Sequence, residues 1–488
     1  MTYRITPSVL FQRALFDVTG AYARFARAQN QISTGRRIRV FSDDPSAASR
    51  ALDLRTTIAK TAQSRESVTS ARLATDSQAA ILEEVSTLII DARARAEEAA
   101  NGSKSPSDLA AIASEINSIL DQVVGRANQT LEGRYLFAGS RIDTTPFQIT
   151  KSFESIISVN YVGDDITRKV RLGPADVKDV DLSGRDAFLS YIRGDTTIAG
   201  SLGLVPSVAA NDTMVGDEKL VVAHTSTVIG DGLGPGGGDA LSGIVPGLST
   251  AADTIIGTTG THRLTVAVEN SGEYTIRLDD GTSVPLDITK TDLTLTNVAG
   301  EKIHVDLTGM TPGFTGTIDL VGNGQIQGGG GTPQTLTFTS DFVLQDGAGR
   351  VVHLDTTGLH GAGESLAVFP GTESVFEVLI SLRDEIEGNS GFSSVGREAR
   401  IQSILGALDR DHQGILGALA KLGARSASFD RIANSLSLFE LSLEEKRGDL
   451  EDADIFQASL DLSQAENAYQ AALMAASKLN GPSLLNYM

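Results

Sequence analysis

Apolar positions near both ends of the chain recur at alternating steps of three and four residues. That spacing keeps one face of a helix against a partner helix and is typical of coiled coils. In the first predicted helix the stripe consists of Phe11, Leu15, Val18, Tyr22, Phe25, Gln29 and Ile32. In the last predicted helix it consists of Ile455, Ala458, Leu462, Ala465, Tyr469, Ala472, Ala476 and Leu479. We therefore predict long helices at both ends of the chain, packed as an antiparallel coiled-coil bundle.

Two more stripes of this kind cover 71–99 and 109–130, on either side of the polar break "NGSKSPSD". An ordinary buried helix face would explain one stripe alone, but four stripes near the two ends favour a bundle that both termini close. Many stripe positions are Ala, Thr or Gln, which bury little apolar area. We expect the outermost helices to be weakly held in a single chain and to need neighbouring subunits.

The middle of the chain has a different pattern, because 37 of the 50 glycines lie in 141–394 and separate runs of alternating polar and apolar residues. Asp280-Gly281 and Asp346-Gly347 each stand between two such runs, which is a β-hairpin signal. We predict a glycine-rich, all-β region inserted between helical ends. The fold class is then α+β with several domains.

These patterns divide the chain into four expected parts. They are terminal assembly helices (1–38 and 452–488), a helical bundle (39–140 and 395–451), a connecting segment that is β before the insert and helical after it (141–195 and 366–394), and an inserted outer β domain (196–365). Charge follows the same division: 141–394 hold 15 basic and 33 acidic residues, whereas the two ends are nearly balanced. An acidic middle argues against nucleic acid as a partner, since phosphate binding needs a basic surface.

Several classes of site are absent from the sequence. The chain contains no cysteine, which excludes disulfides, thiolate metal sites and thiol nucleophiles. No apolar run approaches the roughly 20 residues of a membrane span, and the first residues lack the pattern of a cleaved secretory signal. We expect no membrane insertion.

Candidate motifs for chemistry are weak. Gly232, Gly234 and Gly237 match G-x-G-x-x-G, but the residues that follow predict no helix whose N-terminus would hold a pyrophosphate. The six histidines are scattered, with no pair at the spacing of helical metal ligands. Adjacent acidic residues lie in predicted turns, where they usually cap or are solvated. We therefore predict no catalytic residue, no cofactor and no metal site.

The stretch "QISTGRRIRVFSDDPSAAS" (31–49) suggests a phosphate grip, a catalytic carboxylate pair or a link between two helices. Its charged and turn-forming residues are Gly35, Arg36, Arg37, Arg39, Asp43, Asp44 and Pro45. Gly35 suits the left-handed residue that ends a helix, while Asp44 and Pro45 suit the N-cap and first residue of the next. We interpret the stretch as an elbow between helices, whose arginines can pair with these aspartates or with acids of a neighbouring subunit.

Several segments resemble the flagellin superfamily. "NQISTGRRIRVFSDDPSAASRALDLR" (30–55) resembles its N-terminal segment, in which a helix ends in a Leu/Ile-Ser-Ser/Thr-Gly-x-Arg-Ile motif before an Asp-Asp turn. Similarity to the members that form the hook–filament junction is carried by "DDP", "GRYLFAGS" (133–140), "YVGDDITRKVRL" (161–172), "SGRDAFL" (183–189) and the C-terminal "LEDADIFQASLDLSQAENAYQAALMAASKLNGPSLLNYM". The resemblance covers 1–195 and 366–488, and the residues between match no pattern of the family.

The resemblance implies a structural protein rather than an enzyme. Such a chain is exported unfolded through the flagellar type III channel without a cleaved signal, with an export chaperone, and is located in the extracellular flagellum. It assembles with other copies of itself, between the hook-side junction protein and flagellin, and serves motility. Its terminal helices line the inside of the tube, and the middle of the chain faces outward.

Two other interpretations remain open from the sequence. A flagellin has the same terminal helices and varies most in its middle. A secreted adhesin or enzyme would carry its site in the acidic β region, where the sequence contains no paired nucleophile and base.

Overall fold

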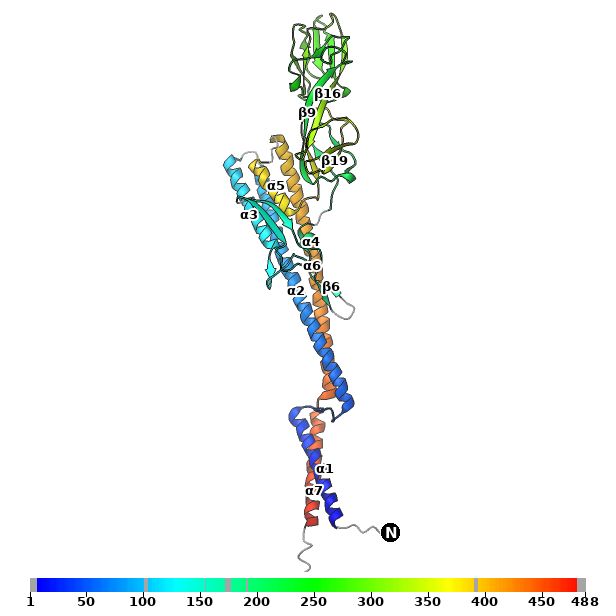
Figure 1. Cartoon of the computed structure of the whole chain (residues 1–488). Coiled ribbons are helices and arrows are strands. Elements are labelled where there is room, and N and C mark those ends of the chain that lie inside the picture. Colours follow the sequence, from blue (N-terminus) through cyan, green and yellow to red (C-terminus); the bar gives the residue numbers. More distant parts are fainter. Residues whose placement is uncertain are drawn as a thin grey trace, which may run out of the picture. The chain divides into compact units, whose positions relative to one another are not determined.

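The computed structural model describes residues 7–100, 104–153, 155–171, 177–189, 192–389 and 394–480. The chain forms two compact units, one of residues 1–75, 169–180 and 424–488, and one of 76–168 and 181–423. Two long helices, α2 (Pro45–Ala100) and α6 (Ser394–Glu451), contribute residues to both units. Helical ends flank a largely β middle, so the predicted α+β multidomain class is confirmed (Figure 1). Residues 1–6 and 481–488 of the expected terminal parts lie outside the described residues.

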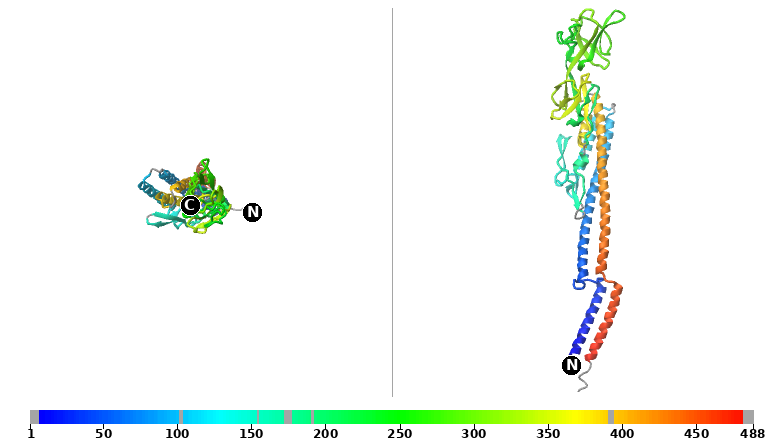
Figure 2. Two further views of the ribbon diagram at one scale, coloured as in Figure 1. Left: turned by 90° about the horizontal axis from the view of Figure 1, so that it is seen from above. Right: turned by 90° about the vertical axis from the view of Figure 1, so that its right-hand side faces the viewer.

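In the first unit, helix α1 (Pro7–Thr34) and helix α7 (Ile455–Asn480) lie side by side in opposite directions (Figures 1 and 2). The C-terminal end of α1 meets the start of α7, where the Ala453 amide donates to the Gly35 carbonyl oxygen at 2.9 Å. A short hairpin of β5 (Lys169–Arg171) and β6 (Val177–Asp179) also belongs to this unit. The predicted antiparallel pairing of the two ends is therefore present within one chain.

The helical part of the second unit contains α3 (Pro106–Ala127), α5 (Val375–Glu387) and parts of α2 and α6. The stripe that the sequence predicts along α2 is buried at every position: Ala71, Thr75, Gln78, Leu82, Val85, Ile89, Ala92, Ala96 and Ala99. Along α3 the stripe holds to Val123, but Arg126 is exposed and Ala127 is buried in its place. A straight helix drifts relative to a strict 3.5-residue repeat, which explains why the predicted stripe leaves the core.

Gln78 is a fully buried polar residue that joins α2 to the segments beside it. Its Nε2 donates to the carbonyl oxygens of Leu136 at 2.7 Å and Leu182 at 2.9 Å. Its Oε1 accepts the Leu182 amide at 2.9 Å. A polar side chain in the stripe therefore satisfies buried backbone groups, which would otherwise destabilise the bundle.

Short strands and one short helix of the second unit pack on this bundle. They are β1 (Thr130–Leu131), β2 (Arg134–Tyr135), β3 (Phe147–Ser152), β4 (Ser155–Tyr161) and α4 (Gly184–Phe188). Phe147 is at their centre, with ring centroids 5.3 Å from Phe188 and 5.0 Å from Phe376 of α5. These aromatic contacts hold the strands against the helices.

The outer part of the second unit, between residues 197 and 369, consists of strands and two short 3₁₀ helices, Ala209–Asn211 and Thr250–Ala252. Its strands are β7 (Thr197–Ala199), β8 (Val205–Pro206), β9 (Gly216–Ile229), β10 (Val245–Pro246), β11 (Gly257–Val268), β12 (Tyr274–Leu278), β13 (Val284–Pro285), β14 (Leu293–Thr296), β15 (Lys302–Asp306), β16 (Gly316–Gly328), β17 (Gln334–Thr335), β18 (Phe342–Gln345), β19 (Val351–Asp355) and β20 (Gly363–Phe369). The main antiparallel sheet has the order β13-β12-β11-β16-β9-β20-β7, with β17 beside β16. Two three-stranded sheets, β10-β15-β14 and β18-β19-β8, complete it.

The long strands β9 and β16 lie side by side through this region (Figure 1). Both contribute residues to its two hydrophobic cores. Leu220 and Ile326 lie in one core, whereas Ile229 and Leu320 lie in the other. The hairpin predicted at Asp346-Gly347 is the β18–β19 hairpin. β9 and β16 pair with each other although they are about ninety residues apart in sequence, so no local turn signal specified that pairing.

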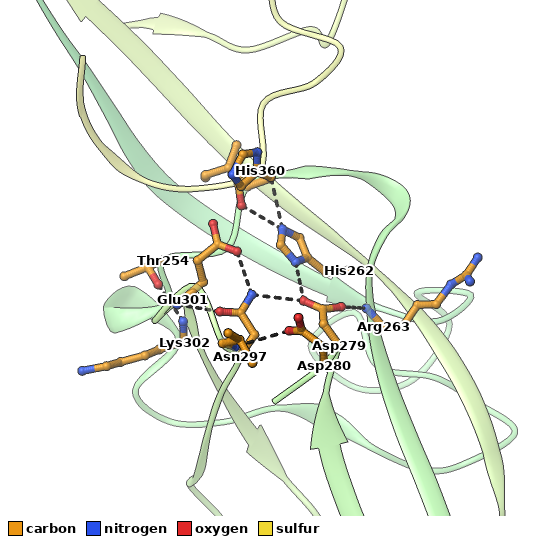
Figure 3. A network of polar contacts seen from close by, with 11 residues as sticks. Thr254, His262, Arg263, Asp279, Asp280, Asn297, Glu301, Lys302 and His360 are labelled. Carbon is orange, nitrogen blue, oxygen red and sulfur yellow. Dashed lines mark hydrogen bonds and ion pairs between the residues drawn. The ribbon is translucent and has the colours of Figure 1, made fainter. Parts of the chain in front are cut away.

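A buried polar network fastens the turn after β12 to the segment before β20 (Figure 3). The His262 ring is 3% exposed, and its Nδ1 lies 2.9 Å from the Asp279 carboxylate. Its Nε2 lies 2.8 Å from the His360 carbonyl oxygen, so acceptors face both ring nitrogens. Burial alone would lower the pKa of His262, but the hydrogen bond and charge of Asp279 outweigh burial and raise it. The geometry is that of a protonated, structural histidine.

Candidate assembly surface at the terminal helices

The predicted stripe of α7 is the face of that helix with the least solvent exposure. Its members Leu462, Ala465, Tyr469, Ala472 and Ala476 are half-buried, and Ala458 is buried. Their neighbours along α7 are exposed. The Leu479 side chain lies outside the described residues. Since α1 is the helix beside α7, this face is occupied within a single chain.

Ring contacts anchor the pair of terminal helices at Tyr469. Its ring centroid lies 5.6 Å from that of Tyr22 and 6.1 Å from that of Phe25, and the Phe25 ring is stacked on it. Such contacts stabilise by about 0.5–1.5 kcal/mol each beyond the area that they bury. The structure thus brings together predicted residues from opposite ends of the sequence.

The face that α1 turns to α7 only partly coincides with the predicted stripe. Val18, Phe25 and Ile32 are half-buried, but Leu15 and Tyr22 are each 56% exposed. The remaining positions of the packed face are filled by Ala14, Ala21 and Ala28, which sequence reasoning missed. These alanines recur every seven residues and, with Val18, Phe25 and Ile32, make a stripe at alternating steps of four and three. Their small size lets two helices approach closely.

Many large apolar side chains of the helix pair face solvent. On α1 they are Val9, Leu10, Phe11, Leu15, Phe16 and Tyr22. On α7 they are Ile455, Phe456, Leu460, Leu473 and Met474. Phe16 is 76% exposed and Phe456 is 77% exposed. Exposed apolar surface of this extent on one pair of helices is typical of a surface that another protein covers.

The elbow between α1 and α2 is built by turn and cap residues. Gly35 has φ +66°, a left-handed conformation that ends α1 and that residues with a side chain rarely adopt. The Asp44 carboxylate accepts the Ala47 amide at 3.0 Å, as an N-cap does, and Pro45 begins α2. These hydrogen bonds lower the pKa of Asp44 below its ordinary value.

Asp43 stabilises the turn of the elbow, and Arg37 connects the elbow to the segment before α7. The Asp43 carboxylate accepts the amides of Arg39 at 3.0 Å and Val40 at 3.1 Å, which lowers the pKa of Asp43. Arg37 donates from its guanidinium to the Leu450 carbonyl oxygen at 2.7 Å, and its Nη1 lies 3.5 Å from Asp44. The aspartates are thus engaged in turn and cap hydrogen bonds.

Glu451, at the end of α6, holds the link between α6 and α7 against the elbow. This residue is 5% exposed, pairs with Arg55 at 2.8 Å, and accepts the Arg37 amide at 2.7 Å through its carbonyl oxygen. Arg36 and Asp452 form a backbone bridge beside it. Sequence reasoning missed Glu451, because its partners precede it by about 400 positions and no local pattern connects them.

A cavity of about 320 Å³ in the second unit is the other candidate site. Asp217, Glu373 and Asp411 line it. Burial raises the pKa of the Glu373 carboxyl to about 7 and that of Asp411 to about 8. Among the described residues, the other polar side chains of its lining are Arg410 and Gln413.

In the ranges that the structure describes, none of the helices combines enough length with enough apolar character to cross a membrane. Within those ranges, acidic residues and histidines form no group of three or more with the arrangement of metal ligands. The G-x-G-x-x-G glycines lie in the loop between β9 and β10, where no helix follows.

Models of known families match both ends of the chain. The N-terminal helical region of bacterial flagellin matches residues 13–141, and the C-terminal helical region matches residues 405–488. Two curated relatives are named flagellar hook-associated protein 3. The protein from Escherichia coli (strain K12) is 34% identical over 149 residues, which are 30% of this chain and 47% of the relative. The protein from Salmonella typhimurium (strain LT2) is 33% identical over 145 residues, 30% of this chain and 46% of the relative.

The chain spans about half the length of these curated relatives. Two solved structures also align with much of the chain. The flagellar protein FlgL of Xanthomonas campestris has a TM-score of 0.42 at 19% identity, with 81% of this chain and 99% of that chain covered. Hook-associated protein 3 of Legionella pneumophila has a TM-score of 0.43 at 17% identity, with 81% and 98% covered. Both ends of the chain thus match helical regions of bacterial flagellin, and part of the chain is similar to flagellar hook-associated protein 3.

Proposed function

We propose that this chain is a structural subunit of the bacterial flagellum that joins hook to filament. The observation that carries the proposal is the apolar surface of the α1–α7 pair, which a single chain leaves exposed at the two ends that match flagellin. Burial of that surface against like helices of neighbouring copies would drive assembly, since apolar area contributes about 25 cal/mol per Å². The protein acts by packing and performs no chemical reaction.

The partners follow from this place in the flagellum. Other copies of the chain would surround the terminal helices, and the hook-side junction protein and flagellin would contact the ring from either side. The chain would reach this extracellular position through the flagellar export apparatus, with an export chaperone that covers its apolar ends. The curated relatives named hook-associated protein 3 support the junction, in preference to the filament, as the location.

Deletion of the gene tests the junction role against the role of a flagellin. In the deletion strain we expect hooks without filaments, and unpolymerised flagellin in the culture medium. Expression of the intact chain from a plasmid should restore the filaments. A strain that lacks flagellin protein altogether while its junctions remain intact would contradict the proposal and indicate a filament subunit.

A matched pair of variants tests whether the packed face of α7 is needed. Ala472→Glu places a carboxylate among half-buried side chains next to Tyr469, where an unpaired charge costs several kcal/mol. Gln470→Glu makes a carboxylate on the exposed side of the same helix. We expect both variants to be exported with a folded β region, and only Ala472→Glu to fail to support a filament. Equal motility of the two strains would show that this face does not determine assembly.

A further inference from the structure

In the terminal unit, basic residues are concentrated in one segment of the chain and acidic residues in another. Residues 18–42, the basic segment, contain five arginines and no acidic residue. Residues 448–477, the acidic segment, contain six acidic residues and no basic one. The first includes the second half of α1 and most of the elbow, and the second includes most of α7. Every copy of the chain therefore has one basic and one acidic segment in the same unit.

The basic segment is largely unpaired within one chain. Arg37 binds Asp44 and the Leu450 carbonyl oxygen. The other four arginines are Arg24, Arg27, Arg36 and Arg39. Their side chains are exposed, and in the described ranges none of them forms an ion pair. From residue 55 onward, by contrast, most arginines of the described chain have an acidic partner.

These arginines surround a hollow beside the elbow. It has a volume of about 480 Å³, and Arg27, Arg36, Arg37 and Arg39 line it together with Asn30 and Gln31. Asp43 and Asp44 also line it, and both carboxylates accept backbone amides. The guanidinium groups thus retain donors for carboxylates from another molecule.

The acidic segment is unpaired in the same way. Glu451 is buried against Arg55 and Arg447. The remaining five acidic residues are exposed: Asp449, Asp452, Asp454, Asp461 and Glu466. Asp454 caps α7 through the Phe456 and Gln457 amides, and Asp461 accepts the Gln457 side chain. Within the described residues none of the five forms an ion pair with an arginine, although α1 lies beside α7.

We propose that the basic segment of one copy binds the acidic segment of the next copy. A surface that differs from the surface it binds makes a head-to-tail contact, and such contacts close into a ring when the rotation between copies allows it. The inference rests on the proposed function, because it assigns the contact that orders copies within the junction. Apolar burial supplies most of the affinity, and the charges select the register and the direction of assembly.

Two charge-reversal variants test the contact from its two sides. The reversed-basic variant is Arg27→Glu with Arg39→Glu, and the reversed-acidic variant is Asp449→Arg with Asp461→Arg. Exposed ion pairs are individually weak, so each variant changes two positions and adds repulsion. In the deletion strain we expect either variant alone to give about tenfold fewer filaments than the wild type. Because α1 and α7 keep their packed face, the purified variants should remain folded, which circular dichroism measures.

Expression of both variants in one cell is the decisive measurement. A copy with the reversed-basic change keeps its acidic segment, and a copy with the reversed-acidic change keeps its arginines. Alternation of the two copies would restore every charge pair, so we expect filaments to return. Failure of the mixture, when one chain with all four changes does assemble, would show that the pairing is within a chain and overturn the proposal.

Matched controls separate charge from structure. Arg27→Lys with Arg39→Lys retains the positive charges and should be tolerated, and so should Arg13→Glu, which lies on α1 outside the basic segment. Normal filaments with the reversed-acidic variant, while the reversed-basic variant fails, would mean that the arginines bind a different partner and would refute the assignment. If the intact chain does not restore filaments to the deletion strain, the proposed junction function itself fails. If the intact chain restores them, the charge variants test only the pairing between copies.

Discussion

Replacement of Tyr469 by alanine is the sharpest probe of the terminal helix pair. The change removes both ring contacts, to Tyr22 and to Phe25, that connect the two ends of the chain. At about 0.5–1.5 kcal/mol for each contact, the free energy that holds α7 on α1 should fall by about 1–3 kcal/mol. Hydrogen exchange of the α7 amides measures this opening directly. We expect their exchange in the isolated protein to accelerate by about 5- to 150-fold.

Two controls define what this result means. Tyr469→Phe keeps both ring contacts and should leave exchange close to wild type, because the Tyr469 hydroxyl is not needed for them. Phe456→Ala removes a ring of the same helix that is 77% exposed, and should also have little effect in the isolated protein. Unchanged exchange in Tyr469→Ala would refute the reasoning, since the helices would then be held by something other than the packed face.

Four further predictions concern the elbow, the polar groups and the insert. Asp44→Asn should retain assembly because an amide oxygen can also cap α2, whereas Asp44→Ala should lower the thermal unfolding midpoint; loss of assembly with Asn in a folded protein would show that the charge is needed. The folded-state pKa of His262 is raised above 6.5, so its contribution to stability is fully present below that pH and is lost as pH rises through the raised pKa. His262→Gln should abolish this part of the pH dependence of urea unfolding. An unchanged pH profile would contradict the prediction. Burial raises the pKa of Asp411 to about 8, so the free energy of unfolding should fall as pH rises from 3.8 toward 8. Asp411→Asn should remove this pH dependence, with the largest gain in unfolding midpoint at the alkaline end. Equal gains at pH 5 and pH 8 would speak against the prediction. Replacement of 196–365 by a short linker should leave export and the joining of hook to filament intact, and failure to join in an exported protein would show that the insert is part of the tube.

The sequence predicted the buried stripe of α2 at all nine positions, because a long helix packed in a bundle obeys one period throughout. It predicted the face of α1 less well, because two overlapping stripes share Val18, Phe25 and Ile32. The larger residues, Leu15 and Tyr22, suggested one stripe, but a close contact between two helices is filled by Ala14, Ala21 and Ala28. Residue size was therefore a poor guide to this face, because close approach of the two helices, and not buried area, determines which residues face the partner.

The elbow could be predicted where its contacts are local. Gly35, Asp44 and Pro45 adopt the conformations that their types favour, so the order of helix end, turn and helix start is legible in the sequence. The interactions of Arg37 and Glu451 cross from one end of the chain to the other, and no periodicity encodes them. The order of strands in the outer β region also depends on contacts between residues distant in sequence, since β16 pairs with β9 across about ninety residues.

Labelling of intact flagella tests the central claim most directly. A short epitope tag in the exposed loop around Gly236, between β9 and β10, would be displayed without disturbing the terminal helices. Immunogold electron microscopy of cells that carry the tagged chain would then show where it is located. We predict label at the boundary between hook and filament alone, and label distributed along the filament would contradict the assignment of this chain to the junction.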